Sequence, residues 1–301
     1  MKIVIGIPAR YGSRRFPGKP LALLAGRPMI AHVIERARSA ALGEVIVATD
    51  DPRIARAARG CGCAVRMTAS RHTSGSERLA AALADLPCDV VVNLQGDEPL
   101  IDPDALRAVV RPFLDDPRLP MATLARPATS DELMRPDVVK VVCNARGEAL
   151  YFSRAPIPFP RDGRGAEERW AHVGLYAYRK EFLMIYPSLT DCAAGRSEAL
   201  EQLRVLHHGY PIAVVKGDFS AFGVDTPEDL AEAERRLLAS GGEGKGAMTA
   251  SQETVIATME GRANPEVAYA TDGFVRESKT ALFDSRRAKS PRKGFLRFDR
   301  E

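Results

Sequence analysis

Residues 2–20, KIVIGIPARYGSRRFPGKP, decide the fold. The first part, Lys2–Ile7, is an uninterrupted run dominated by Val and Ile, which is typical of a central β-strand that is covered on both faces. The second part is a loop that contains two glycines and several cations. A glycine-containing loop after the first strand of a parallel sheet lies at the carboxyl ends of the strands, where α/β folds bind ligands. The sequence therefore predicts an α/β protein whose ligand site begins in this loop.

Further strands and helices alternate along the chain. Apolar runs typical of strands occupy Glu44–Thr49, Ala64–Met67, Asp89–Leu94, Met121–Ala125, Val138–Cys143, Val173–Tyr178 and Ile212–Val215. Apolar spacings of three and four predict helices over Pro28–Ala40, Pro52–Arg59, Gly75–Ala84, Pro103–Phe113, Ser197–Leu206 and Thr226–Ser240. This alternation predicts a Rossmann-like, mostly parallel, doubly wound sheet with helices on both faces.

The domain organisation follows from changes in composition. Residues 1–240 carry the strand and helix pattern and form one predicted domain. Within it, about 121–180 is rich in short strands and contains the proline-rich joint PIPFP, which indicates a β-rich insertion for specificity or subunit contact. Residues 241–301 begin with GGEGKGAM and end in SRRAKSPRKGFLRFDRE, which predicts a flexible linker and a basic tail. A solvated tail is the simplest interpretation, and contact with nucleic acid is the alternative.

Charge and cysteine content exclude several classes of protein. Forty-three Lys and Arg against 39 Asp and Glu leave a net charge of +4 in 301 residues, which does not favour nucleic acid or a membrane as the main partner. The five cysteines lack the paired spacing of a zinc site and are expected to be reduced thiols in a cytoplasm. The opening MKIVIGIPAR lacks the apolar core of a signal peptide, and no apolar stretch approaches the roughly 20 residues of a transmembrane helix.

The loop after the first strand has the composition of a phosphate-binding loop. Its glycines allow backbone N–H groups to approach phosphate oxygens, and its arginines and lysine neutralise a triphosphate. A solvated basic loop is the alternative, but the ordered string R-x-G-S-x-R-x-P-G-K after a buried strand is much more specific than scattered cations. The pattern GxxxxGK[ST] of a Walker loop does not occur. The candidate residues are Arg10, Ser13, Arg15 and Lys19.

Two aspartates are candidate metal ligands. Asp97 follows a strand in VVNLQGDEP, at the rim where a hard cation that bridges phosphates is held by one or two carboxylates. Asp225 directly precedes a predicted helix in FGVDTPEDL. A turn residue at Asp97 and a helix cap at Asp225 are the alternatives. We prefer the hypothesis that the two carboxylates hold one metal on the reacting phosphates.

Three more segments carry polar residues. HTSGSERL (72–79) precedes a helix and offers Ser74 and Arg78 to a base edge, a sugar hydroxyl or a carboxylate. HVGLYAYR (172–179) and EALEQLR (198–204) supply further candidates, although a lone His or Tyr is more often a core residue than a ligand. Glu201 and Arg204 are three residues apart on a predicted helix, so an ion pair between them is another interpretation.

Taken together, these segments resemble a known family. IPARYGSRRFPGKPL, ATDD at 48–51, HTSGSERL, NLQGDEP, ALYFSRAPIPF, HVGLYAYR, LEQLRVL and GVDTPEDL occur in the order typical of 3-deoxy-manno-octulosonate cytidylyltransferases, over roughly residues 1–238. The resemblance implies a Rossmann-like nucleotidyltransferase fold, a homodimer, and transfer of CMP from CTP to 3-deoxy-D-manno-octulosonate (Kdo) with release of pyrophosphate, for lipopolysaccharide biosynthesis. Cytidylyltransfer to 8-amino-Kdo or sialic acid, or a non-catalytic nucleotide-binding protein, remain alternatives.

The resemblance also implies roles for individual residues. The CTP phosphates are expected to contact Arg10, Ser13, Arg15 and Lys19, Ser74 is a further expected nucleotide-binding residue, and Mg²⁺ is expected to be bound by Asp97 and Asp225. Lys19 and the two aspartates are the expected catalytic residues. The sugar acid is expected to contact Arg78, Gln95, His172, Tyr176, Glu201 and Gln202. No side chain stands out as a general base, so we expect metal-assisted deprotonation of the anomeric hydroxyl that attacks the α-phosphorus.

Overall fold

Strand β1 (Ile3–Ala9) lies inside the central sheet, between β4 (Gly43–Thr49) and β6 (Val90–Asn93), and runs parallel to both. The structure is a computed structural model that describes residues 1–240 apart from 14, 73 and 162–168. Every residue of β1 after Ile3 is buried. The unbroken apolar run therefore forms the covered central strand that the sequence predicts.

The described residues form a nine-stranded mixed sheet in the order β11-β7-β10-β6-β1-β4-β5, with β8 paired to β10 and β9 to β8. The further strands are β5 (Ala64–Met67), β7 (Met121–Pro127), β8 (Lys140–Cys143), β9 (Ala149–Ser153), β10 (Trp170–Arg179) and β11 (Ile212–Lys216). A two-stranded hairpin joins β2 (Leu23–Leu24) and β3 (Arg27–Pro28). The mostly parallel α/β prediction is confirmed, although β10 runs antiparallel to both of its main-sheet neighbours, β6 and β7.

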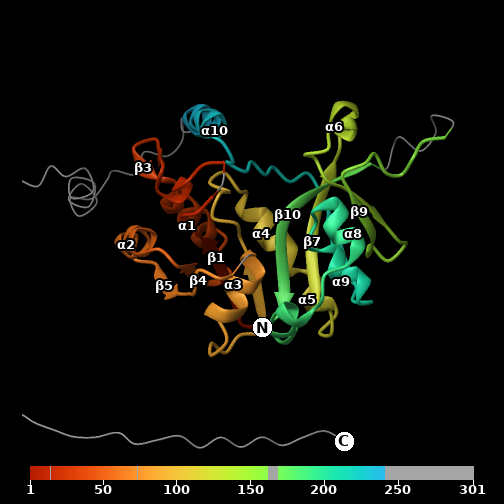
Figure 1. Ribbon diagram of the computed structural model, residues 1–301, viewed down its shortest axis with the longest axis horizontal. Helices are drawn as coiled ribbons and strands as arrows, with labels where there is room; N and C mark the ends of the chain where they lie inside the picture. Colours follow the sequence, from red (N-terminus) through yellow and green to blue (C-terminus); the bar gives the residue numbers. More distant parts are fainter. Residues whose placement is uncertain (14, 73, 162–168, 241–301) are drawn as a thin grey trace, which may run out of the picture. The chain divides into compact units, whose positions relative to one another are not determined.

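Helices cover both faces of the sheet (Figure 1). On one face lie α1 (Met29–Ser39), α2 (Pro52–Gly60), α4 (Pro103–Val110) and α5 (Pro112–Asp115). On the other lie α3 (Gly75–Ala82), α7 (Lys180–Ile185), α8 (Ala193–Glu198) and α9 (Leu203–His207). Short α6 (Ser130–Met134), the long C-terminal α10 (Pro227–Ser240) and the 3₁₀ turns Lys19–Leu21 and Tyr186–Ser188 complete the described elements.

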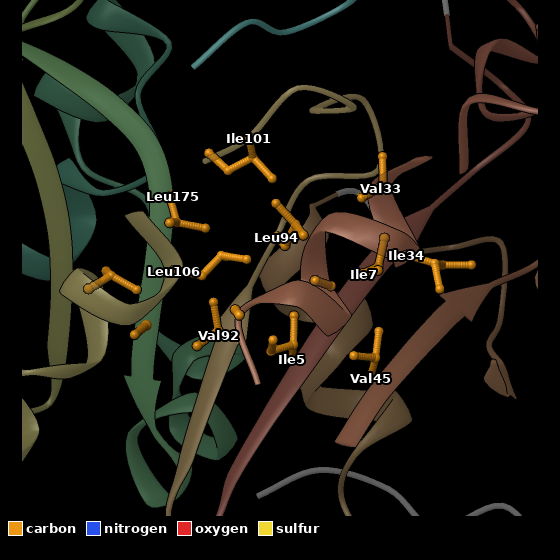
Figure 2. Close-up of a cluster of buried hydrophobic side chains, with 14 of the residues drawn as sticks. Ile5, Ile7, Val33, Ile34, Val45, Val92, Leu94, Ile101, Leu106 and Leu175 are labelled. Carbon is orange, nitrogen blue, oxygen red and sulfur yellow. The ribbon is translucent and has the colours of Figure 1, made fainter. Parts of the chain in front are cut away.

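The two faces of β1 pack in different ways. Ile5 and Ile7 point into the cluster beneath α1, together with Val33 and Ile34 (Figure 2). On the opposite face, a Cβ on Gly6 would approach the side chain of Leu79 to 2.6 Å. Glycine at this position therefore leaves room for the Leu79 side chain, through which α3 packs against the strand.

Two predicted features differ in the structure. The helix predicted over Ser197–Leu206 is two short helices, because Ala199 adopts a left-handed conformation (φ 51°) that ends α8. The predicted insertion, 121–180, includes β7 and β10, which are strands of the central sheet; only the segment between them, with α6, β8 and β9, extends from it. The sequence did not predict β9, α6 or α7.

The remaining part of the chain, 241–301, contains the predicted linker and basic tail and lies outside the described residues. No helix in the described ranges is long and apolar enough to cross a bilayer.

Candidate active site

A pocket of about 320 Å³ opens where β1 and β6 end, because both strands direct their carboxyl ends to the same edge of the sheet. It brings together all the predicted nucleotide and metal ligands and two of the predicted sugar ligands. These residues are Arg10, Ser13, Arg15, Lys19, Ser74, Arg78, Gln95, Asp97 and Asp225. Segments that are remote in the sequence therefore form one polar site.

Tyr11 holds the loop after β1 in its shape. Its carbonyl oxygen accepts hydrogen bonds from the backbone N–H groups of Ser13 (2.9 Å) and Gly18 (2.8 Å). Gly18 has a φ of 74°, and a Cβ there would approach the Tyr11 ring to 2.8 Å. On the ring lies the guanidinium of Arg53, 3.6 Å from its centroid, which in turn donates to Asp51 at 2.7 Å. Sequence analysis missed this contact between Tyr11, Arg53 and Asp51. The only signals were an aromatic residue inside the loop and the second acidic residue of ATDD.

Lys19 lies between the two candidate metal ligands. Its Nζ donates to the Asp97 carboxylate, to Asp225 Oδ1 at 3.1 Å and to the Val224 carbonyl at 3.1 Å. Asp225 also accepts from Arg15 Nη2 at 2.6 Å. Burial by itself would lower the pKa of Lys19, but the two carboxylates outweigh it and raise this pKa. The two aspartates thus converge on one cationic group, as a shared metal site requires.

The structure decides whether Asp225 is a helix cap. The backbone N–H groups of Asp225 and Thr226 both donate to the side chain of Asp229, at 3.0 and 2.9 Å. Thr226 Oγ1 accepts from the Asp229 N–H at 3.2 Å and so caps α10. Because Asp229 and Thr226 satisfy this helix end, the Asp225 carboxylate is left for Lys19 and Arg15.

Backbone contacts lock the two acidic segments together. The Val224 N–H donates to the Asp97 carbonyl oxygen at 2.8 Å, and the Phe222 N–H donates to Glu98 Oε2 at 3.1 Å. Desolvation, together with the charge of Asp97, raises the pKa of Glu98 to about 8. Glu98 therefore serves mainly as a tie between the segments and adds little negative charge at neutral pH.

The donor set fits Mg²⁺. Mg²⁺ in phosphate-transfer sites is usually bound by one or two carboxylates plus substrate phosphates and water. The pair of Asp97 and Asp225 supplies such carboxylates, and the Lys19 ammonium between them shows that their geometry accommodates a cation. Among the described residues, no group of three or more His, Cys, Asp or Glu side chains converges as a closed metal site.

Arg78 and Gln95 form the wall of the pocket next to α3. The Arg78 side chain is 3% exposed and donates to Thr68 Oγ1 at 2.6 Å, while Asp50 lies 3.5 Å away. Gln95 Nε2 donates to Asn93 Oδ1 at 3.1 Å. A guanidinium that is buried and only weakly paired with a carboxylate is suited to an anionic ligand group.

The other four predicted sugar ligands do not line this pocket. The His172 ring lies between two core rings, with its centroid 5.0 Å from that of Phe152 and 5.4 Å from that of Tyr176. Burial lowers the pKa of His172 to about 3, and its Nε2 lies 2.9 Å from Thr123 Oγ1. The ring contacts hold both side chains in place, and their prediction as sugar ligands stays a prediction.

Glu201 and Gln202 lie behind the pocket, in the turn before α9. Glu201 accepts from the Tyr186 hydroxyl at 3.1 Å and is hydrogen-bonded to Ser74, which lines the pocket. Gln202 is 2% exposed, and its Nε2 has no hydrogen-bond partner in the described part of the chain. The alternative of an ion pair between Glu201 and Arg204 is not found: the described partners of Arg204 within 4 Å are Glu77 and Asp191, at 3.9 and 3.8 Å.

Comparison with known proteins shows the family of the chain. Residues 3–214 match the family model described as Cytidylyltransferase. The 3-deoxy-manno-octulosonate cytidylyltransferase of Syntrophotalea carbinolica is 49% identical over 247 residues, which cover 79% of this chain and 99% of the relative. The chain belongs to the 3-deoxy-manno-octulosonate cytidylyltransferase family.

Other members of the family and a solved structure show the same relationship. The enzyme of that name from Anaeromyxobacter dehalogenans is 53% identical over 243 residues, covering 79% of this chain and 98% of the relative. A solved structure of CMP:2-keto-3-deoxy-manno-octonic acid synthetase complexed with CTP is 44% identical, with a TM-score of 0.77, and covers 80% of this chain and 100% of that one. About a fifth of this chain therefore has no counterpart in these relatives.

Proposed function

We propose that the protein transfers CMP from CTP to Kdo, giving CMP-Kdo and pyrophosphate, for lipopolysaccharide biosynthesis. The observation that carries the proposal is the pocket in which four loop residues and two aspartates converge, in a chain whose relatives bear the name of this enzyme. A CTP complex of a related synthetase supports CTP as the nucleotide. Cytidylyltransfer to a related acidic sugar is the alternative that the same pocket admits.

The loop residues bind and orient the triphosphate. Arg10, Ser13, Arg15 and Lys19 line one side of the pocket, so their N–H and O–H groups face a single ligand. The arginine and lysine charges stabilise the negative charge that builds up on the departing pyrophosphate. Ser74 lines the pocket at the start of α3, where its Oγ accepts from the Glu77 N–H at 3.1 Å, and this fixes its hydroxyl beside the nucleotide.

Asp97 and Asp225 are the proposed ligands of Mg²⁺. When bound, Mg²⁺ neutralises phosphate charge and lowers the pKa of the attacking hydroxyl. Arg15 and Lys19, which neutralise the two carboxylates in this structure, then have the nucleotide phosphates as partners. No side chain is assigned as general base, and the proton of the attacking hydroxyl would pass to solvent water.

Arg78 and Gln95 are the proposed direct ligands of the sugar acid. The buried Arg78 guanidinium pairs with the sugar carboxylate, and the Gln95 amide meets a hydroxyl group. Glu201 and Gln202 are proposed to face the sugar acid too. Glu201 lies next to Ser74, which lines the pocket, and the buried Nε2 of Gln202, which has no hydrogen-bond partner among the described residues, supports a contact with substrate. His172 and Tyr176, whose rings lie 5.4 Å apart, are proposed to contact the sugar acid as well.

We also propose a homodimer in the cytoplasm. Three large apolar side chains of the segment around β8 and β9 are strongly exposed: Met134 at 72%, Leu150 at 60% and Phe159 at 80%. Such side chains support a subunit interface in this segment. The five free cysteines, Cys61, Cys63, Cys88, Cys143 and Cys192, support a reducing compartment.

The test is pyrophosphate release from CTP and Mg²⁺, with Kdo, 8-amino-Kdo and sialic acid offered in parallel. Release with Kdo alone is expected. Release with another acid would keep the chemistry and change the substrate. Folded protein that releases pyrophosphate with none of the three acids would contradict the proposed function.

A further inference from the structure

A line of hydrogen-bonded side chains runs from the core to the pocket wall. The Tyr178 hydroxyl lies 3.0 Å from Ser76 Oγ, Asn93 Nδ2 donates to Ser76 Oγ at 3.3 Å, and Gln95 Nε2 donates to Asn93 Oδ1 at 3.1 Å. Tyr178, Ser76 and Asn93 are all 0% exposed. Only Gln95, at the end of the line, reaches the pocket.

The line joins three elements that meet only in the folded chain. Asn93 ends β6, Ser76 lies in the first turn of α3, and Tyr178 lies on β10, the antiparallel strand beside β6. Strands and a helix hold these side chains from three sides, so their positions are more rigid than those of loop residues. A buried polar group without a hydrogen-bond partner costs free energy, so a buried network of this kind favours the one arrangement in which all its hydrogen bonds form.

The direction of the hydrogen bonds decides which Gln95 atom faces the substrate. Asn93 uses Nδ2 toward Ser76 and therefore presents Oδ1, an acceptor, to Gln95. Burial and the nearby Glu201 raise the pKa of Tyr178, so its hydroxyl keeps its proton, and either hydroxyl of the Tyr178–Ser76 pair can donate to the other. Gln95 must then donate Nε2 inward, and its Oε1 is left as the acceptor for a substrate hydroxyl.

The Gln95 amide lies beside the start of α3. A Cβ on Gly75, the first residue of α3, would lie 3.3 Å from Gln95 Oε1 and 3.4 Å from Nε2, so glycine at this position leaves room for the amide. The hydrogen bond to Asn93 Oδ1 then sets which of its two ends points inward.

We propose that Asn93, held by Ser76, is a positioning residue that orients the Gln95 amide so that Oε1 accepts a hydrogen bond from a hydroxyl of the sugar acid. This inference rests on the proposed function, in which Gln95 contacts the sugar. Asn93 itself does not touch substrate; it acts through Gln95.

The test is a double-mutant cycle on pyrophosphate release, with the KM values for Kdo and CTP measured separately. Asn93→Leu keeps the side-chain volume and removes both amide hydrogen bonds. It is expected to raise the KM for Kdo about tenfold and to change the KM for CTP by less than about twofold. In the Gln95→Ala background the same substitution is expected to raise the KM for Kdo by less than about twofold, because the residue through which Asn93 acts is gone.

Two variants separate orientation from general loosening. Asn93→Asp is expected to keep the KM for Kdo at pH 6, because a buried, protonated carboxyl donates to Ser76 and accepts from Gln95 as the amide does. Ser153→Ala removes another buried hydroxyl, which donates to Glu198 at 2.6 Å away from the line, and serves as the matched control with no change in either KM. If Asn93→Leu does not fold, Ser76→Ala takes its place in the same double-mutant cycle with Gln95→Ala.

Loss of Kdo affinity that is equally large in the Gln95→Ala background would overturn the inference, as would equal rises in both KM values. The wild-type rate with Kdo reports separately on the proposed function: if the folded wild type is inactive with Kdo, that function fails and this inference fails with it. If the wild type is active with Kdo but the effects of the two substitutions are additive, the proposed function stands and only the positioning role of Asn93 is refuted.

Discussion

Replacement of Lys19 by Met is expected to tighten metal binding to the nucleotide-free protein. The Lys19 ammonium occupies the space between Asp97 and Asp225, where it competes with a divalent cation for the same oxygens. At 3.1 Å and an effective dielectric constant near 20, its attraction to Asp225 is about 5 kcal/mol before solvation is considered. The Asp225 side chain is 44% exposed, so solvent screening leaves only a fraction of that value. We take about 1.4 kcal/mol, which corresponds to about tenfold in Kd.

The assay is titration of Mn²⁺, an ion that favours oxygen ligands, into protein without CTP, with free Mn²⁺ followed by electron paramagnetic resonance. Lys19→Met should bind Mn²⁺ about tenfold more tightly than the wild type, although it should lose most of its turnover. Lys19→Arg keeps the charge and is the matched control, with no tightening. If Lys19→Met folds normally and binds Mn²⁺ no better than the wild type, the two aspartates are not a cation site that Lys19 occupies.

Three further variants test other parts of the site. Asp225→Asn is expected to lower kcat about a hundredfold with little change in the KM for CTP; equal losses in both would show that Asp225 only binds nucleotide. Arg53→Ala removes the guanidinium that lies on the Tyr11 ring and should raise the KM for CTP several-fold, whereas Arg66→Ala, at an exposed ion pair, should leave it unchanged. His172→Gln should be less sensitive to acid than the wild type. The pKa of His172 falls from 6.5 to about 3 on folding, so the unfolded chain binds the extra proton and wild-type stability falls as the pH drops below 6.5. Between pH 6.5 and 5, the free energy of unfolding measured with denaturant should fall by up to about 2 kcal/mol more for the wild type than for the variant. If the two free energies change with pH in parallel, the burial of His172 is contradicted.

The sequence predicted the fold well wherever the signal was local. The Val and Ile run before the loop is apolar at every position, and only a strand covered on both faces can bury all of those side chains. The same locality explains why Arg10, Ser13, Arg15 and Lys19 line one pocket, because a short loop after such a strand lies at the edge of the sheet. The sequence could not predict that β10 runs antiparallel, because strand direction depends on pairing with segments far away in the chain.

What the sequence by itself determined about this protein is the α/β pattern, the cationic loop and the two aspartates as candidates. Only the tertiary structure decided their use. It showed that Asp229 and Thr226, and not Asp225, satisfy the start of α10, which leaves the Asp225 carboxylate for Lys19. It also packed His172 between Phe152 and Tyr176 and joined Asn93 to Gln95 by a hydrogen bond. The physical reason is that a hydrogen bond or an ion pair requires atoms within about 3 to 4 Å, and only the folded chain sets those distances between remote residues.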